Sequence, residues 1–119
     1  MSNMRNSVLL MGNLGGDPEF SKFENGTMRA LVSLATSESY RNKNGDLVTK
    51  TEWHRCKAWG KMAERMNSVL RKGKKVALRG KLTYNSYEDK DGNQRYSTEI
   101  VVEEFELMEG NKGSSTPAS

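Results

Sequence analysis

Three short stretches in which Asn or Asp precedes Gly constrain this chain more than any other feature of its sequence. They are ENGT at 24–27, KNGD at 43–46 and KDGN at 90–93. Asn or Asp before Gly tolerates the positive φ of tight β-turns, so each stretch predicts the turn of a β-hairpin. Strand-like sequence flanks all three turns and also opens the chain, at 6–14, 20–23, 28–37, 47–59, 75–87 and 94–107. The chain is therefore predicted to be mostly antiparallel β.

One segment, at 61–73, has a helical period instead. Its apolar residues recur at helical spacing on one face, at Met62, Met66, Val69 and Leu70, and Gly73 follows in the place of a C-cap. We expect this face to close the open end of a barrel. Strands, one short α-helix between strands 3 and 4, and then a long hairpin form the order of an all-β, five-stranded OB-fold Greek-key barrel with long β-hairpin arms. Another small barrel or a sandwich would give a similar pattern.

The length of 119 residues suits one domain with a modest core, which we place at 1–109. The remaining stretch, GNKGSSTPAS at 110–119, is rich in Gly, Ser, Thr and Pro and predicts a disordered tail. The aliphatic run VLLM near the start is too short for a signal peptide or a membrane span. One Cys and one His exclude an intramolecular disulfide and a structural zinc site, so we predict no metal, no cofactor and a reducing, cytoplasmic setting.

The charge of the chain is unevenly distributed. Four glutamates crowd its C-terminal end, so residues 1–102 hold 18 Lys and Arg against 11 Asp and Glu, a net charge of +7. A basic body of this size is typical of proteins that bind a polyanion, although many basic surfaces are merely solvated. Net charge alone does not distinguish a polyanion-binding surface from a solvated one.

Both tryptophans of the chain lie in TEWHRCKAWGK at 51–61. In a strand, side chains alternate between two faces. One face would hold aromatic rings and cations, at Trp53, Arg55, Lys57 and Trp59, and the other would be small and mostly apolar, at His54, Cys56 and Ala58. Single-stranded nucleic acid offers phosphates to cations and unpaired bases to rings. At about 3.3 Å per residue the two rings lie about 20 Å apart, so they would stack on different nucleotides along a track.

Two tyrosines on the predicted hairpin arms extend this pattern. Tyr40, with Arg41 and Lys43, and Tyr87 each lie a few residues before a glycine turn, on arms too exposed to need an aromatic residue for core packing. Cross-strand pairing is the alternative role for each tyrosine. For Tyr84 the sequence leaves open whether the ring faces a ligand or the core.

No residue pattern indicates an enzyme. His54 has no second metal ligand and no nucleophile at a suitable spacing. The glycines of GNLGGDPE, at 12–19, precede no helix and no Gly-Lys-Ser/Thr, so they predict a barrel bend or bulge and not a phosphate loop. The acidic residues are scattered and suggest no acid–base pair.

Five stretches together resemble the bacterial single-stranded DNA-binding proteins. They are GNLGGDPE, LATSESYR, TEWHRCKAWGKMAE, LRKGKKVALRGKL and RYSTEIVVEEFELM, in family order over about 6–109. The resemblance implies an OB-fold subunit, usually of a homotetramer, that binds and protects single-stranded DNA during replication, recombination and repair. It also implies that the protein is not an enzyme and that it is cytoplasmic and associated with the nucleoid. The DNA would be bound by aromatic rings that stack on its bases and by Lys and Arg side chains that contact its phosphates.

The resemblance also implies roles for single residues. Trp53 matches a stacking tryptophan of the family, Trp59 falls where the family has another aromatic residue, and His54 matches a histidine near its subunit contacts. Tyr40 and Tyr87 stand where tryptophan is common. Family members usually continue into a tail with an acidic tip that docks replication and repair proteins, whereas this sequence stops at STPAS, which leaves such partners open. An RNA-binding OB module and a protein-only OB adaptor are the alternatives.

Overall fold

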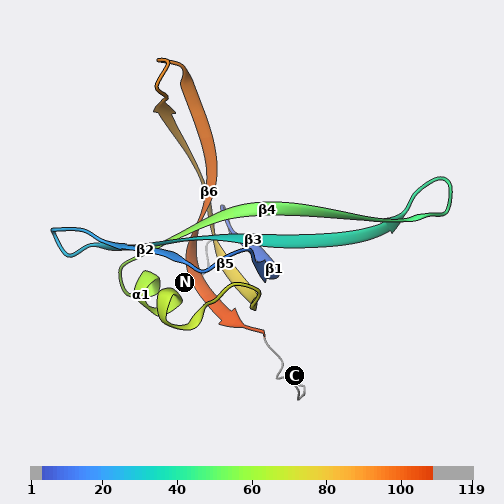
Figure 1. Cartoon of the computed structure of the whole chain (residues 1–119), viewed down its shortest axis with the longest axis horizontal. Coiled ribbons are helices and arrows are strands. Elements are labelled where there is room, and N and C mark those ends of the chain that lie inside the picture. Colours follow the sequence, from blue (N-terminus) through green and yellow to red (C-terminus); the bar gives the residue numbers. More distant parts are fainter. Residues whose placement is uncertain (1–3, 109–119) are drawn as a thin grey trace.

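Six strands and one helix make up residues 4–108, the part of the chain that the computed structural model describes. In chain order they are β1 (Val8–Leu14), β2 (Glu19–Lys22), β3 (Met28–Arg41), β4 (Leu47–Trp59), α1 (Gly60–Val69), β5 (Lys75–Glu88) and β6 (Gln94–Leu107), as Figure 1 shows. The predicted tail at 110–119 lies outside the described residues. No helix in the described range is long and apolar enough to cross a membrane.

Five of the strands close into a barrel. The sheet order is β1-β5-β6-β4-β3, and β1 pairs again with β3. All barrel pairings are antiparallel except that of β4 with β6, which is parallel at Cys56 with Ile100 and Lys57 with Val101. This is the predicted OB-fold barrel, with its helix between the third and fourth barrel strands. Strand β2 pairs only with β3 and forms a short extra hairpin outside the barrel.

The three Asn/Asp–Gly stretches are all hairpin turns, but their geometry differs in one respect from the prediction. The glycines, Gly26, Gly45 and Gly92, have φ of +89°, +82° and +83°, while no described residue other than glycine has a positive φ. In the first turn the Phe23 N–H donates to the Thr27 carbonyl, and the Gly26 N–H donates to the Phe23 carbonyl. This is a three-residue loop in which only the last position is left-handed, so the preceding Asn or Asp keeps a negative φ.

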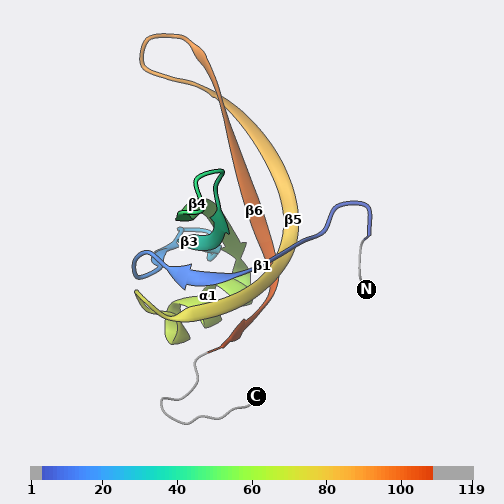
Figure 2. The same cartoon turned by 90° about the vertical axis from the view of Figure 1, so that its right-hand side faces the viewer.

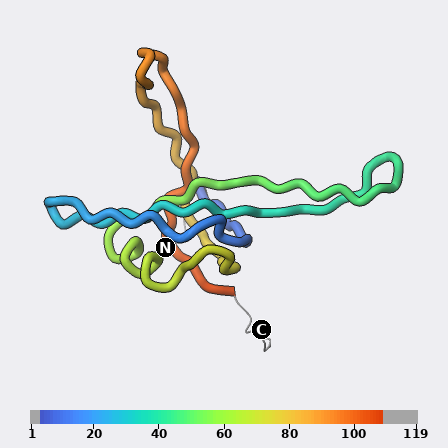
Figure 3. Tube along the Cα trace, viewed as in Figure 1, coloured from blue at the N-terminus to red at the C-terminus, as the bar shows by residue number. Residues whose placement is uncertain are grey.

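Two hairpins continue well beyond the barrel as arms (Figure 3), and Figure 2 shows the course of the β5–β6 arm from the side. Pairing of β3 with β4 runs to Arg41 and Leu47, and pairing of β5 with β6 runs to Glu88 and Gln94. In Figure 1 the first arm points right and the second points up, so they leave the barrel in different directions. The predicted long arms are confirmed.

The helix covers one end of the barrel with a narrower face than predicted. Ala63, Met66 and Leu70 are fully buried, but Val69 is exposed. The buried face of the helix is centred on Ala63, Met66 and Leu70, and Val69 lies at the edge of this face. The helix also ends before Gly73: Leu70 is the C-cap and its N–H donates to the Met66 carbonyl, while Gly73 occupies the turn that follows.

Two glycines mark places where barrel strands approach each other closely. A Cβ on Gly12 would lie 2.0 Å from the Ala35 carbonyl oxygen, and a Cβ on Gly80 would lie 2.1 Å from that of Val101. Strand pairing of β5 with β6 is irregular between Arg79 and Gly80. Gly12, in the glycine-rich stretch of the sequence, thus permits a close backbone approach.

A candidate nucleic-acid interface

The outer face of β4 has the composition that its alternation predicted. Trp53 is 62% exposed and Trp59 43% exposed, whereas Cys56 and Ala58 are buried on the opposite face. His54 is only partly buried. Large rings therefore face solvent on a strand whose other face is packed against the core.

The ring of Trp53 lies over the loop that follows β1. A Cβ on Gly15 would lie 2.6 Å from Trp53 Cζ3, so only glycine leaves room for the ring in this position. The Gly15 N–H donates to the Ser33 carbonyl at 3.0 Å, which fixes the loop against β3. Trp53 also lines a pocket of about 340 Å³ together with Arg55 and Glu99. The ring is thus held by its surroundings and has an open space beside it.

Glu99 of β6 lies at the centre of this surface, and the sequence analysis missed it. Only 9% of the residue is exposed. Its carboxylate accepts a hydrogen bond from Asn85 Nδ2 at 2.9 Å, forms an ion pair with Lys57 Nζ at 2.8 Å and lies 3.9 Å from Arg55 Nε. These partners come from β5 and β4, so one carboxylate joins three strands.

The two cations between the tryptophans differ in what they can still bind. The Lys57 side chain is 19% exposed, and its Nζ lies 5.6 Å from the centroid of the Trp59 ring as well as against Glu99. The Arg55 side chain is 68% exposed. Sequence alternation gave the two residues the same role, but in the structure the charge of Lys57 is matched by a carboxylate and that of Arg55 projects into solvent.

Tyr87 lies on the same side of the β5–β6 arm as this cluster. Alternation places Thr83, Asn85 and Tyr87 on one face of the arm. On that same face they pair across the strands with Glu99, Ser97 and Arg95 of β6. Thr83 Oγ1 donates to the Glu99 carbonyl and Asn85 contacts the Glu99 carboxylate. The face that bears Trp53 and Trp59 therefore continues along this arm to Tyr87.

The β3–β4 arm is arranged differently. Ala35 pairs with Trp53 and Tyr40 pairs with Val48, so alternation places Tyr40 on the opposite side of the arm from Trp53, whereas Arg41 is on the same side as Trp53. Two hydroxyl pairs line the Trp53 side, Ser37 with Thr51 and Ser39 with Thr49, each at 3.0 Å. Arg41 donates to the Gly45 carbonyl in the turn, and Lys43 is exposed there. The structure thus joins Arg41, but not Tyr40, to the face of β4.

The question left open for Tyr84 has a clear structural answer. Tyr84 and Tyr96 lie on the face of the β5–β6 arm opposite Tyr87, and they are 73% and 76% exposed. Tyr84 therefore faces neither the core nor the surface around Glu99. Tyr96 was not singled out in the sequence, although it lies just after the same glycine turn that Tyr87 precedes.

His54 has a polar partner on the face of β4 opposite Trp53. Its Nε2 lies 2.9 Å from Thr36 Oγ1. The expected subunit contact at His54 stays a prediction. Within the described range 4–108, no group of three or more His, Cys, Asp or Glu side chains could hold a metal ion.

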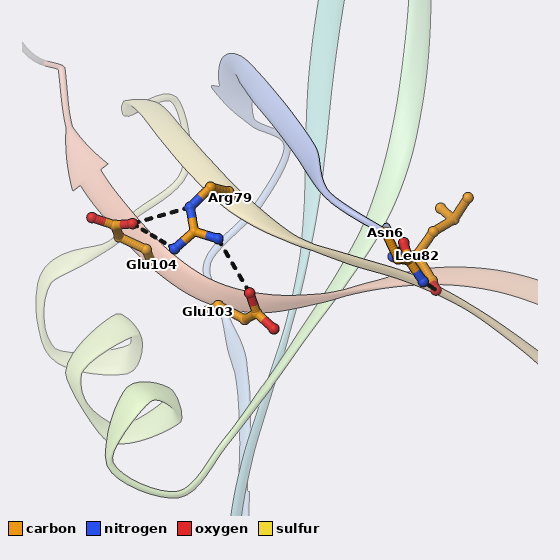
Figure 4. Close-up of polar contacts among 5 residues, drawn as sticks. All are labelled: Asn6, Arg79, Leu82, Glu103 and Glu104. Carbon is orange, nitrogen blue, oxygen red and sulfur yellow. Dashed lines mark hydrogen bonds and ion pairs between the residues drawn. The ribbon is translucent and has the colours of Figure 1, made fainter. Parts of the chain in front are cut away.

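A second cluster of carboxylates and a cation lies on another part of the barrel and provides a contrast (Figure 4). Arg79 pairs with Glu104 at 2.8 Å and with Glu103 at 3.3 Å, and the hydrogen bonds that the guanidinium donates to Glu104 raise the pKa of Arg79. Glu104 is largely exposed, unlike Glu99.

Farther along β5, the Asn6 amide exchanges two hydrogen bonds of 2.9 Å with the backbone of Leu82 and so prolongs the pairing of β1 with β5.

Comparison with known sequences gives consistent matches. The model of the single-strand binding protein family matches residues 5–108. The chain is 39% identical over 105 residues to a protein of Xylella fastidiosa named single-stranded DNA-binding protein, and 39% identical over 109 residues to single-stranded DNA-binding protein 1 of Chlorobaculum tepidum. These matches cover 88% and 91% of this chain, but 64% and 67% of the two relatives.

Solved structures give the same result. The chain is similar to the Plasmodium falciparum SSB in complex with ssDNA, with a TM-score of 0.81 and 27% identity over 87% of this chain and 95% of the other. It is also similar to a deletion mutant of the single-stranded DNA binding protein from Thermus aquaticus, with a TM-score of 0.76 and 26% identity over 88% of this chain and 51% of the other.

Proposed function

The chain belongs to the single-strand binding protein family, and from this premise we propose that it binds and protects single-stranded DNA without regard to sequence and without catalysis. The observation that supports this most directly is the outer face of β4, with two exposed tryptophans and the exposed Arg55 between them. Stacking contributes roughly 1 to 3 kcal/mol per base and depends little on which base it is. Replication, recombination and repair are the processes in which we expect this activity.

The proposed DNA track has a central part and two extensions. Trp53, Arg55 and Trp59 form the centre, and Tyr87 continues it on the β5–β6 arm. On the other arm the proposed contacts are Arg41 and Lys43, with Tyr40 available to a strand that crosses to the far side of the arm. Lys57 is also part of the proposed track, because its Nζ lies 5.6 Å from the centroid of the Trp59 ring.

Tryptophan fluorescence tests this function, because both tryptophans of the chain lie on the proposed track. Titration with oligo-dT should quench most of the emission. An unchanged spectrum at saturating oligo-dT would contradict the proposal. A matched RNA oligonucleotide is the second arm of the titration, since stacking and phosphate contacts do not exclude a 2′-hydroxyl. Tighter binding of RNA would favour an RNA-binding module, and no binding of either would favour a protein-only adaptor.

We further propose a homotetramer in the cytoplasm, associated with the nucleoid, where single-stranded DNA arises. The exposed apolar side chains of Leu9 and Met11 on β1 support self-association, because an apolar surface of this kind is stabilised by a partner. Light scattering should give a multiple of the 13.4 kDa chain mass at micromolar concentration. His54→Asp should lower the assembly state, and a monomeric wild-type protein would contradict this part of the proposal.

A further inference from the structure

We propose that Glu99 is a specificity-determining residue, which holds the cations of the β4 face so that a ligand is selected by its bases and not by its negative charge alone. The inference rests on the proposed function, since it concerns how the same surface distinguishes a DNA strand from other polyanions. The mostly buried carboxylate of Glu99 lies between the two cations of the β4 face.

The contacts of Glu99 show how the local charge is arranged. Its carboxylate is 2.8 Å from Lys57 Nζ and 3.9 Å from Arg55 Nε, and Asn85 donates a further hydrogen bond at 2.9 Å. Water and salt screen buried charges poorly. The two cations and the carboxylate therefore present about one net positive charge to a ligand, and the charge of Lys57 is already matched by Glu99 before any ligand arrives.

A phosphate and a base respond differently to this arrangement. A phosphate that approached the pocket beside Trp53 would meet Glu99, and Asp17 and Glu19 line the same pocket. Like charges at this range repel, and their repulsion is strong where the surroundings are partly dry. A base has no charge to be repelled, and it gains stacking on the tryptophans. The pocket thus favours a strand whose bases point inward and whose phosphates pass outside, near Arg55.

The Arg79 cluster does not combine a buried carboxylate with a stacking surface for bases. Glu103 and Glu104 pair with Arg79 on a different part of the barrel, and their side chains are 40% and 66% exposed. Their charges are screened by solvent, and neither carboxylate lines the pocket beside Trp53. Charge neutralisation is therefore common to both clusters, but only Glu99 combines it with burial and with stacking rings.

The test compares Glu99→Gln with Glu52→Gln, which removes the same charge from the opposite face of β4, where Glu52 pairs with Lys50 at 3.4 Å. Each variant is titrated with oligo-dT and with inorganic polyphosphate of equal phosphate number. Relative to Glu52→Gln, we expect Glu99→Gln to raise affinity for polyphosphate about tenfold, the effect of roughly one close charge, and affinity for oligo-dT by less. Equal polyphosphate affinity in the two variants would overturn the inference.

Lys57→Gln provides an independent measurement if Glu99→Gln does not fold. If Lys57 is already engaged by Glu99, its loss should leave the slope of log affinity for oligo-dT against log salt nearly unchanged. If Lys57 instead binds a phosphate, the slope should fall by about 0.7, and the inference is wrong. Wild-type protein that fails to bind oligo-dT would refute the proposed function itself, whereas normal wild-type binding with no difference among the variants refutes only the role of Glu99.

Discussion

The two faces of strand β4 share one backbone, yet they are subject to different constraints. The inner face has Cys56 and Ala58, small side chains that are excluded from solvent by the barrel. The outer face has Trp53 and Trp59, large rings that remain exposed to solvent. Stability should therefore depend on one face and DNA affinity on the other, and substitutions can be chosen to separate the two.

The largest effect is expected on the inner side of the barrel. Leu34 of β3 is fully buried, and Leu34→Ala should lower the free energy of unfolding by about 2 to 5 kcal/mol through the cavity that it leaves. Denaturant titration gives this value. Leu47→Ala is the control, since Leu47 is exposed and its loss should cost less than about 0.5 kcal/mol. Similar costs for the two variants would mean that the barrel interior is not the main source of stability.

Trp53→Ala tests the outer face. Loss of one stacking ring should weaken oligo-dT binding by roughly 1 to 3 kcal/mol, with a smaller change in the free energy of unfolding. Trp53→Phe, which keeps a ring, should retain part of the affinity. If Trp53→Ala instead lost stability and kept its affinity, the ring over Gly15 would be a packing residue and the separation of the two faces would fail.

Alkaline pH tests the inner face without changing its shape. Burial raises the pKa of the Cys56 thiol to about 12, from 9.0 for an exposed thiol. The folded state keeps its proton while the unfolded state loses it, so this contribution to stability is full below pH 9 and is lost as the pH rises from 9 to 12. By pH 10 the loss is about 1.4 kcal/mol. Cys56→Ala should lack this component in denaturant titrations, and an identical pH dependence in both proteins would contradict it.

The smallest effect is expected for Arg55 on the outer face. Arg55→Gln should reduce the slope of log affinity against log salt by about 0.7, because one phosphate contact is lost, and should leave the free energy of unfolding nearly unchanged. Titration of oligo-dT at several salt concentrations measures the slope. Lys50→Gln, a change at an exposed lysine on the other face, is the matched control. An equal change of slope in both variants would indicate a general charge effect.

Local pattern was enough to predict much of this molecule, because hairpin turns, strand alternation and helical period are set by neighbours in the chain. The alternation of β4, with Trp53 outside and Cys56 inside, needed no knowledge of other strands. The pair of Lys57 with Glu99 could not be predicted in this way. It depends on the parallel contact of β4 with β6, whose register is fixed only when the barrel closes.

The side of the β3–β4 arm on which Tyr40 lies could not be predicted from the sequence either, for a different reason. Its orientation relative to Trp53 follows from the register across the β3–β4 hairpin, and that register depends on the length of the loop at the turn. The Asn-Gly pair indicated the turn but not the three-residue loop. A shift of the pairing by one residue would have placed Tyr40 on the side of Trp53.

The close approaches at Gly12 and Gly80 limit how far this sequence can change. At both positions a carbonyl oxygen occupies the place of a Cβ, so even alanine, the smallest replacement, collides with backbone and not with a side chain that could move aside. In a library randomised at single positions and selected for folded protein, glycine alone should survive at these two sites. Trp53, in the same selection, should accept many residues. Mutational drift in such a barrel can therefore alter its ligand face freely while the strand crossings stay fixed.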